Sequence, residues 1–300
     1  MPLADARLFH VNVNCASLER SRRFYADGLG FEIGAHTAPE SAQPGDAFGL
    51  ERARWDASIM LGRQGYEGGA IDLLEWHEPG PIGTPPAHIT ECGLQRLGVR
   101  VPDLDEALAR IAALGGRAWS DPLTHNANGH DIRIVMAEDP DGIAIELVEG
   151  GETTVSFVAI ACHDLDHSLA FYESLGFREV ARYASDNADG THLRVDGPVA
   201  MVEVVLTAPG GGDALVILVG FRVPAPELLP PRAANTVGMW RAAFLVGDLP
   251  AATTALAREG IATISAPVSM EMGAGLPELR FVCFRGPDGE VIELIEQPRV

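Results

Sequence analysis

The chain has 300 residues and carries 42 acidic against 22 basic side chains, a formal net charge of −20. Every basic residue is an arginine, which excludes Schiff-base chemistry on a lysine amine and a lysine-dependent phosphate loop. The acidic balance argues against nucleic acid and anionic membrane surfaces as partners. The longest apolar run, 214–221, is far short of the roughly 20 residues of a membrane span. With no signal-peptide pattern and four scattered cysteines, we expect a cytoplasmic protein.

In chain order, one unit of a strand, a helix and several further strands is predicted four times. Each unit opens with an alternating or apolar strand, and the helix that follows begins at a residue able to cap it. The capping residues are Ser17, Asp103, Asp164 and Asp248. Stretches such as GGAIDLLEW (68–76) and IAIELVE (143–149) supply the later strands.

The second half of the sequence repeats the first. ASLERSRRFYADGLGF (16–31) matches HDLDHSLAFYESLGF (163–177), 97–116 matches 242–260, and EDPDGIAIELVE (138–149) matches RGPDGEVIELIE (285–296). Three collinear matches predict a duplication that is split near Gly150 and Gly151. We therefore expect two domains, 1–150 and 151–300.

The connections between the units differ in length. Proline-rich linkers separate the first unit from the second (78–88) and the third from the fourth (223–231), whereas only GGET (150–153) joins the second to the third. This pattern favours pairing of units within each half. Pairing of the first unit with the fourth remains open as the alternative.

The strand followed by DL, S, FY and LGF, and the closing PDG with IEL, resemble the vicinal oxygen chelate superfamily. That superfamily includes glyoxalase I, extradiol dioxygenases and bleomycin-binding proteins. The resemblance implies an α+β fold of four βαβββ modules that form two cupped, barrel-like domains. A metal usually sits in the cup of this family, held by the first and last strands of each module. The fold hosts unrelated reactions, so it does not by itself fix the activity.

The resemblance places four residues of the first half at the family's ligand positions, namely His10, Asp72, Arg96 and Glu146. Alternation along the strands adds the neighbours Asn12, Asn14, Trp76 and Arg100 on the same face. Trp55 is a further candidate for stacking on a flat ligand. The first domain is thus expected to hold a polar cup.

In the second half the same positions hold Phe157, Val216, Arg241 and Glu293. Two apolar side chains cannot hold a divalent ion, so the second domain is expected to hold an apolar, degenerate cup. If the first unit pairs with the fourth, the mixed site contains His10, Asp72, Arg241 and Glu293. The residue types of that mixed site are the same as those of the first half.

Arg96 places a permanent positive charge where the fourth ligand is expected. Like charges about 4 Å apart in a partly buried site repel by roughly 4 kcal/mol, so we favour a site without a tightly bound metal. His10 would move the proton and Asp72 would orient it or act as partner base, while Arg96 with Glu146 would bind or polarise an oxygen function. Arg241 and Glu293 are candidate substrate-binding residues. The expected enzyme isomerises, epimerises, dehydrates or cyclises a small or medium oxygenated molecule, with aromatic compounds and secondary metabolites among the candidate substrates.

Two alternatives stay open. A metal-dependent dioxygenase or glyoxalase-like lyase would bind iron, manganese or zinc through His10, Asp72 and Glu146. A non-catalytic protein would instead sequester an antibiotic or a similar ligand in the apolar cup. In each of these alternatives the protein binds a small molecule. The chain is expected to be a monomer or a homodimer.

Overall fold

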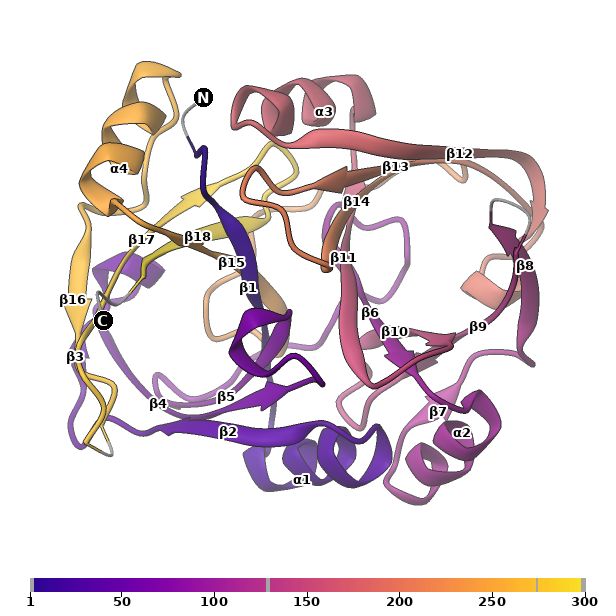
Figure 1. Cartoon of the computed structure of the whole chain (residues 1–300), viewed down its shortest axis with the longest axis horizontal. Coiled ribbons are helices and arrows are strands. Elements are labelled where there is room, and N and C mark those ends of the chain that lie inside the picture. Colours follow the sequence, from indigo (N-terminus) through magenta and orange to yellow (C-terminus); the bar gives the residue numbers. More distant parts are fainter. Residues whose placement is uncertain (1–2, 128–129, 274, 298–300) are drawn as a thin grey trace.

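The computed structural model describes residues 3–127, 130–273 and 275–297. Two curled sheets of nine strands each lie side by side, with the α-helices at their periphery (Figure 1). The α+β fold of tandem βαβββ modules is therefore confirmed. In the part of the chain that is described, no helix is long and apolar enough to cross a membrane.

The four modules follow the repeat of the sequence. The first contains β1 (Arg7–Asn14), α1 (Leu18–Arg23), β2 (Glu32–Thr37), β3 (Gln43–Pro44), β4 (Arg52–Leu61) and β5 (Ala70–Glu78). The second contains β6 (Gly93–Val101), α2 (Leu104–Ala113), β7 (Arg117–Ala118), β8 (Leu123–Ala127), β9 (His130–Glu138) and β10 (Ala144–Glu149). The third contains β11 (Thr154–Cys162), α3 (Leu165–Ser174), β12 (Arg178–Asp189), β13 (Pro198–Thr207) and β14 (Leu215–Val223). The fourth contains β15 (Gly238–Val246), α4 (Leu249–Arg258), β16 (Val268–Met270), β17 (Leu279–Arg285) and β18 (Val291–Glu296).

Each helix begins where its capping residue predicts. Ser17, Asp103, Asp164 and Asp248 each accept a hydrogen bond from a backbone N–H of the first helical turn. This bond satisfies a donor that the helix itself cannot pair. Local side-chain chemistry therefore fixes the start of every helix.

Strand pairing joins modules from opposite halves of the chain. One sheet runs β16-β17-β18-β15-β1-β5-β4-β2 and so combines the first and fourth modules. The other runs β12-β13-β14-β11-β6-β10-β9-β7 and combines the third and second modules. The prediction that modules pair within the halves 1–150 and 151–300 to form one cup each is wrong, and the alternative pairing is the one observed.

The lengths of the connections explain this arrangement. The join at 150–153 leads from β10 to β11, which lie in one sheet with only β6 between them, and four residues reach at most about 14 Å. The linkers 79–92 and 224–237 are long enough to cross from one sheet to the other. They also pair with each other, because Ile82 N donates to Asn235 O at 3.0 Å and Cys92 N donates to Glu227 O at 2.9 Å.

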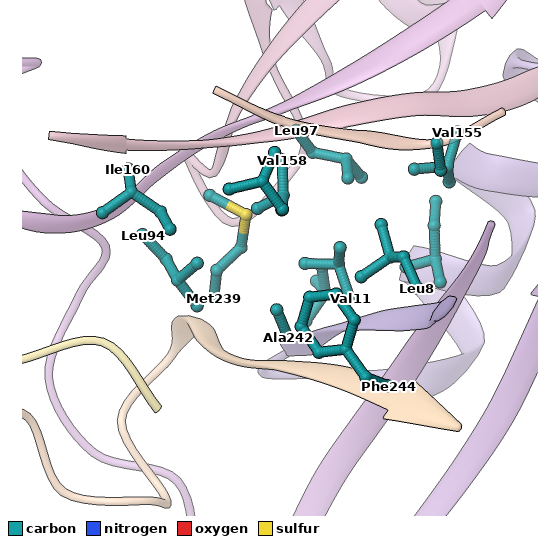
Figure 2. Close-up of a cluster of buried hydrophobic side chains, with 14 of the residues drawn as sticks. Leu8, Val11, Leu94, Leu97, Val155, Val158, Ile160, Met239, Ala242 and Phe244 are labelled. Atoms are coloured by element: carbon teal, nitrogen blue, oxygen red, sulfur yellow. The ribbon is translucent and has the colours of Figure 1, made fainter. Parts of the chain in front are cut away.

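The main core lies between the convex faces of the two sheets. Figure 2 shows Val11 of β1 and Phe244 of β15 on one side of this core, with Leu97 of β6 and Val158 of β11 on the other. Alternation along β1 turns His10 and its polar neighbours to the opposite, concave face, as predicted. We call the concave face of the β1 and β15 sheet the first cup and that of the β6 and β11 sheet the second cup.

Hydrogen bonds between a helix of one module and a turn of the next connect the two modules of each sequence half. Tyr25 of the FY motif donates its hydroxyl to Asp139 Oδ2 at 3.2 Å, and Tyr172 donates to Glu290 Oε1 at 2.8 Å. Burial raises the pKa of Asp139 to about 7 and that of Glu290 to about 8. The repeated FY and PDG motifs therefore stabilise the fold, because they bond one module to the next.

Candidate functional site

An arginine held between two carboxylates lies at the base of the first cup. Arg241 of β15 bonds Asp72 Oδ2 through Nη2 at 2.8 Å and Glu293 Oε2 through Nε at 2.8 Å. His10 Nε2 lies 3.8 Å from Asp72 Oδ2 and 3.5 Å from Glu293 Oε2. The structure thus assembles the mixed set that the alternative module pairing predicts.

This group is almost completely shielded from water. The residues His10, Asp72, Arg241 and Glu293 are between 2% and 6% exposed. Burial opposes the charge of Arg241, but Glu293 and Asp72 raise its pKa above the ordinary value. Burial likewise opposes the charge of Glu293, but Arg241 and His10 hold its pKa below the ordinary value. Both ring nitrogens of His10 and Arg241 Nη1 are buried without a hydrogen-bond partner.

An aromatic side chain fills the first cup above the arginine. Phe48, on the 3-10 turn Asp46–Phe48, lies over the Arg241 guanidinium with 5.7 Å to the ring centroid. Its ring also packs against Trp55, Trp76 and Trp240 at centroid distances of 5.5–6.0 Å. Trp55 and Trp76, predicted to stack on a ligand, are core residues here. The first cup is therefore packed with the protein's own side chains.

The polar neighbours on β1 are also engaged inside the protein. Asn14 donates to the carbonyls of Ala234 and Thr236 at 2.7 and 2.9 Å and accepts from the Trp76 indole at 3.0 Å. Asn12 donates to the Asp72 backbone carbonyl at 3.3 Å. Both asparagines are fully buried, so they orient the cup rather than face an incoming molecule.

The second cup contains the other arginine centre. Arg96 of β6 bonds Glu146 Oε2 through Nε and Glu203 Oε1 through Nη2, both at 2.6 Å, and donates to Gln95 Oε1 at 2.5 Å. The centroid of the Phe157 ring lies 5.6 Å from the guanidinium carbon of Arg96. Burial opposes the charge of Arg96, but Glu146 and Glu203 raise its pKa above the ordinary value.

A pocket opens above this second centre. Its volume is about 450 Å³, and its lining includes Arg96, Glu146 and Glu203 together with mainly aliphatic and aromatic side chains. The loop at the mouth differs from that of the first cup. The 3-10 turn Thr191–Leu193 offers His192 and Leu193 to the pocket wall, whereas the turn at Asp46–Phe48 inserts a phenylalanine. A pocket of this size suits a small organic molecule.

The four residues predicted to be catalytic therefore separate into two pairs. His10 and Asp72 lie in the first cup with Arg241 and Glu293, while Arg96 and Glu146 lie in the second. The predicted single site fails because modules one and two contribute to different sheets.

The structure differs from the sequence predictions at three further positions. Arg100 is exposed and does not line the pocket. Val216 belongs to the core, and its neighbour Ile217 faces the second cup, because Ile217 pairs with Ala159 as Asp72 pairs with Asn12. Glu203 was missed, although it is the one charged residue in the apolar strand PVAMVEVVLT.

The metal that is usual in this family does not fit either arginine centre. In the first cup a guanidinium already bonds both carboxylates, and it is a permanent cation that cannot act as a ligand. In the second cup the corresponding positions hold Arg96, Phe157 and Ile217 beside Glu146. Among the described residues, no group of three or more His, Cys, Asp or Glu is arranged to hold a metal ion. The set His10, Asp72 and Glu146 is excluded as a ligand set because Glu146 lies in the other cup.

Comparison with known proteins agrees with this architecture. A model of the Glyoxalase/Bleomycin resistance protein/Dioxygenase superfamily matches residues 7–147 and 154–294. Since these two matches cover most of the chain, the protein belongs to this superfamily. It is thus a vicinal oxygen chelate protein with a tandem duplication, as its motifs indicate.

Relatives of known name are distant. The chain is 26% identical over 186 residues to lactoylglutathione lyase GLX1 of Arabidopsis thaliana, covering 59% of this chain and 57% of the relative, so it spans less than two thirds of that protein. It is 26% identical over 146 residues to the uncharacterized protein YaeR of Escherichia coli. This match covers 48% of this chain and 95% of YaeR. A mutant of glyoxalase I from Zea mays has a similar fold, with a TM-score of 0.69 at 17% identity over 97% of this chain and 92% of the maize chain.

Proposed function

We propose that this protein is an enzyme of the vicinal oxygen chelate type that performs general acid–base chemistry without a metal in the pocket of the second cup. One observation carries the proposal. A buried arginine holds two carboxylates at the base of an otherwise mainly apolar pocket of about 450 Å³. The substrate class is a small or medium oxygenated molecule, and the reaction is an isomerisation, epimerisation or elimination. The kinship with lactoylglutathione lyases supports an enzyme rather than a structural protein.

The second glutamate supplies the base in this proposal. Glu203 bonds Arg96 through Oε1, and its side chain is 21% exposed, which leaves Oε2 for the substrate. This oxygen takes a proton from a carbon beside a carbonyl, and the electron pair of the broken C–H bond moves to the carbonyl oxygen. The proton then returns to the same carbon in an epimerisation or to a neighbouring carbon in an isomerisation. In an elimination the electron pair expels the leaving group, which departs with the proton. No oxidant or reductant is needed for this step.

Arg96 supplies the electrophile. A guanidinium has five N–H donors, and Arg96 uses three of them for Glu146, Glu203 and Gln95. The remaining donors are available to the oxygen that gains negative charge, which is the role that fixed cations play in such reactions. Glu146 holds the guanidinium from the other side. The His10 and Asp72 group has the role of a buried cross-link in the first cup.

Hydrogen exchange tests the proposal directly. Small ketones are incubated with the protein in D2O after treatment with a chelator, and NMR follows loss of the proton signal beside the carbonyl. We expect exchange that survives the chelator and that falls at least about 100-fold in Glu203→Gln, since a general base contributes about 10²–10⁴-fold. The exposed Glu173→Gln is the matched control. Exchange that requires a metal, or that is equal in both variants, would overturn the proposal.

The same pocket also suits a protein that sequesters its ligand. Its mainly apolar lining, with Phe157, Met201 and Ile217, favours binding even without turnover. The exchange experiment separates the two readings. Binding without exchange across the ketone panel would favour sequestration.

A further inference from the structure

We infer that the second cup selects molecules that carry a protonated amine on an apolar body. This inference rests on the proposed use of the pocket as the small-molecule site. It specifies the charge of the ligand, which the acid–base proposal leaves open.

The charge inventory of the pocket favours a cation. Among its described lining residues, Arg96 is the one permanent cation, Glu146 and Glu203 are the carboxylates, and His125 and His192 are the remaining titratable imidazoles. With neutral imidazoles the lining has one more negative than positive charge. A charge in a poorly hydrated site is costly unless an opposite charge pairs with it. A ligand with one positive charge would therefore neutralise the site.

The geometry shows which charged atoms meet the ligand. The side chain of Arg96 is 6% exposed, whereas those of Glu146 and Glu203 are 15% and 21% exposed. Arg96 bonds Glu146 at Oε2 and Glu203 at Oε1, so each carboxylate keeps its other oxygen as an acceptor. An ammonium group can donate to the free oxygen of Glu146, which leaves the free oxygen of Glu203 to act as the base, whereas an anionic head group would meet both carboxylates and be repelled.

The walls define the rest of the molecule. Ile132, Ile134, Val148 and Met201 supply aliphatic surface, and Phe157 with Tyr183 supplies aromatic faces. Burial of apolar surface contributes roughly 25 cal/mol per Å², so an uncharged ring or chain gains affinity from this wall. An amine with an aromatic or aliphatic body matches both parts of the pocket.

Three probes of one shape test the inference. Phenylbutylamine, phenylbutanol and phenylbutyrate share a phenyl ring on a short aliphatic chain and carry a cationic, a neutral and an anionic head group, and their affinities are measured by calorimetry. The assay uses pH 8, where an alkylamine is protonated and imidazole is neutral. Salt at about 0.15 M limits the range of exposed charges to about 8 Å and so suppresses general attraction by the acidic surface. Met201→Trp fills the pocket and reports whether the probes bind there.

We expect the amine to bind at least about tenfold more tightly than the alcohol, because only the amine brings a positive charge that pairs with the excess carboxylate in a poorly hydrated site. The carboxylate should bind most weakly. Glu146→Gln should abolish the preference for the amine and retain alcohol binding, whereas the exposed Glu173→Gln should change neither. Equal affinities of amine and alcohol at the pocket, or tighter binding of the carboxylate, would overturn the inference.

The proposed function fails in a different way. If Met201→Trp leaves the binding of all three probes unchanged, the pocket is not the small-molecule site, and both the function and the inference are wrong. If neutral ketones exchange their protons at Glu203 while amines show no preference, the function stands and the inference alone is wrong.

Discussion

Removing the arginine of the first cup should cost much more stability than removing its counterpart. Arg241→Met leaves Asp72 and Glu293 as two carboxylates in a site where every member is at most 6% exposed. Breaking a buried ion pair by deleting one partner costs about 3–5 kcal/mol, and we expect a loss at the upper end because two salt bridges of 2.8 Å disappear together. Urea unfolding at pH 7, with the slope compared between variants, measures this loss of unfolding free energy.

Two further measurements test whether the loss comes from buried charge. Arg96→Met should cost about 1–3 kcal/mol, because Glu146 and Glu203 reach the pocket and keep part of their hydration. The loss in Arg241→Met should also shrink by more than about 1 kcal/mol from pH 7 to pH 5, since protons can then neutralise the stranded carboxylates. A loss below about 1 kcal/mol for Arg241→Met, or equal losses for the two arginines, would refute the view that Arg241 compensates buried charge.

The remaining predictions concern the wall of the second cup, a buried carboxyl group between modules, and metal binding in the first cup. Gly98→Ala would place a Cβ 2.3 Å from the Phe157 ring and should destabilise by about 1–3 kcal/mol, a loss that Phe157→Leu relieves if the ring is the obstacle. Because the pKa of Glu290 is raised to about 8, its native carboxyl keeps a proton that the unfolded chain releases above about pH 4.5. The unfolding free energy of the wild type should therefore fall relative to Glu290→Gln as pH rises from 5 to 7.5, by up to about 1.4 kcal/mol per unit, and a constant difference would contradict the raised pKa. Arg241→His restores a set of four potential ligands and should gain one equivalent of zinc by elemental analysis, whereas failure to bind would show that the donors are misplaced.

Much of the fold follows from local features of the sequence. Ser17 and the three aspartates at the other helix starts cap their helices, and alternation on β1 separates His10 from the core. The module pairing does not follow, because a short join permits either a domain boundary or a turn between near neighbours in one sheet. The strand order of the structure shows that linkers 79–92 and 224–237 both cross between the sheets, and backbone hydrogen bonds join the two linkers to each other.

The sequence predicts the residue types of the two arginine centres, but it predicts less well which side chains contact each other there. Both arginines and their glutamates on β10 and β18 are visible from the repeat. Ile217 was missed by one position, because a slip of one residue turns a strand's side chains to the other face. The insertion of Phe48 into the first cup depends on the path of a loop, and no repeat in the sequence specifies it. This loop decides which cup remains open.

We expect an arginine, rather than the family's metal, to occupy the centre of each cup. An anomalous difference map of crystals grown with zinc and manganese tests it most directly. We predict no peak in either cup, with Arg241 bonded to Asp72 and Glu293 and Arg96 bonded to Glu146 and Glu203. A peak within about 2.0–2.3 Å of His10, Asp72 and Glu293, with Arg241 turned away, would contradict the claim.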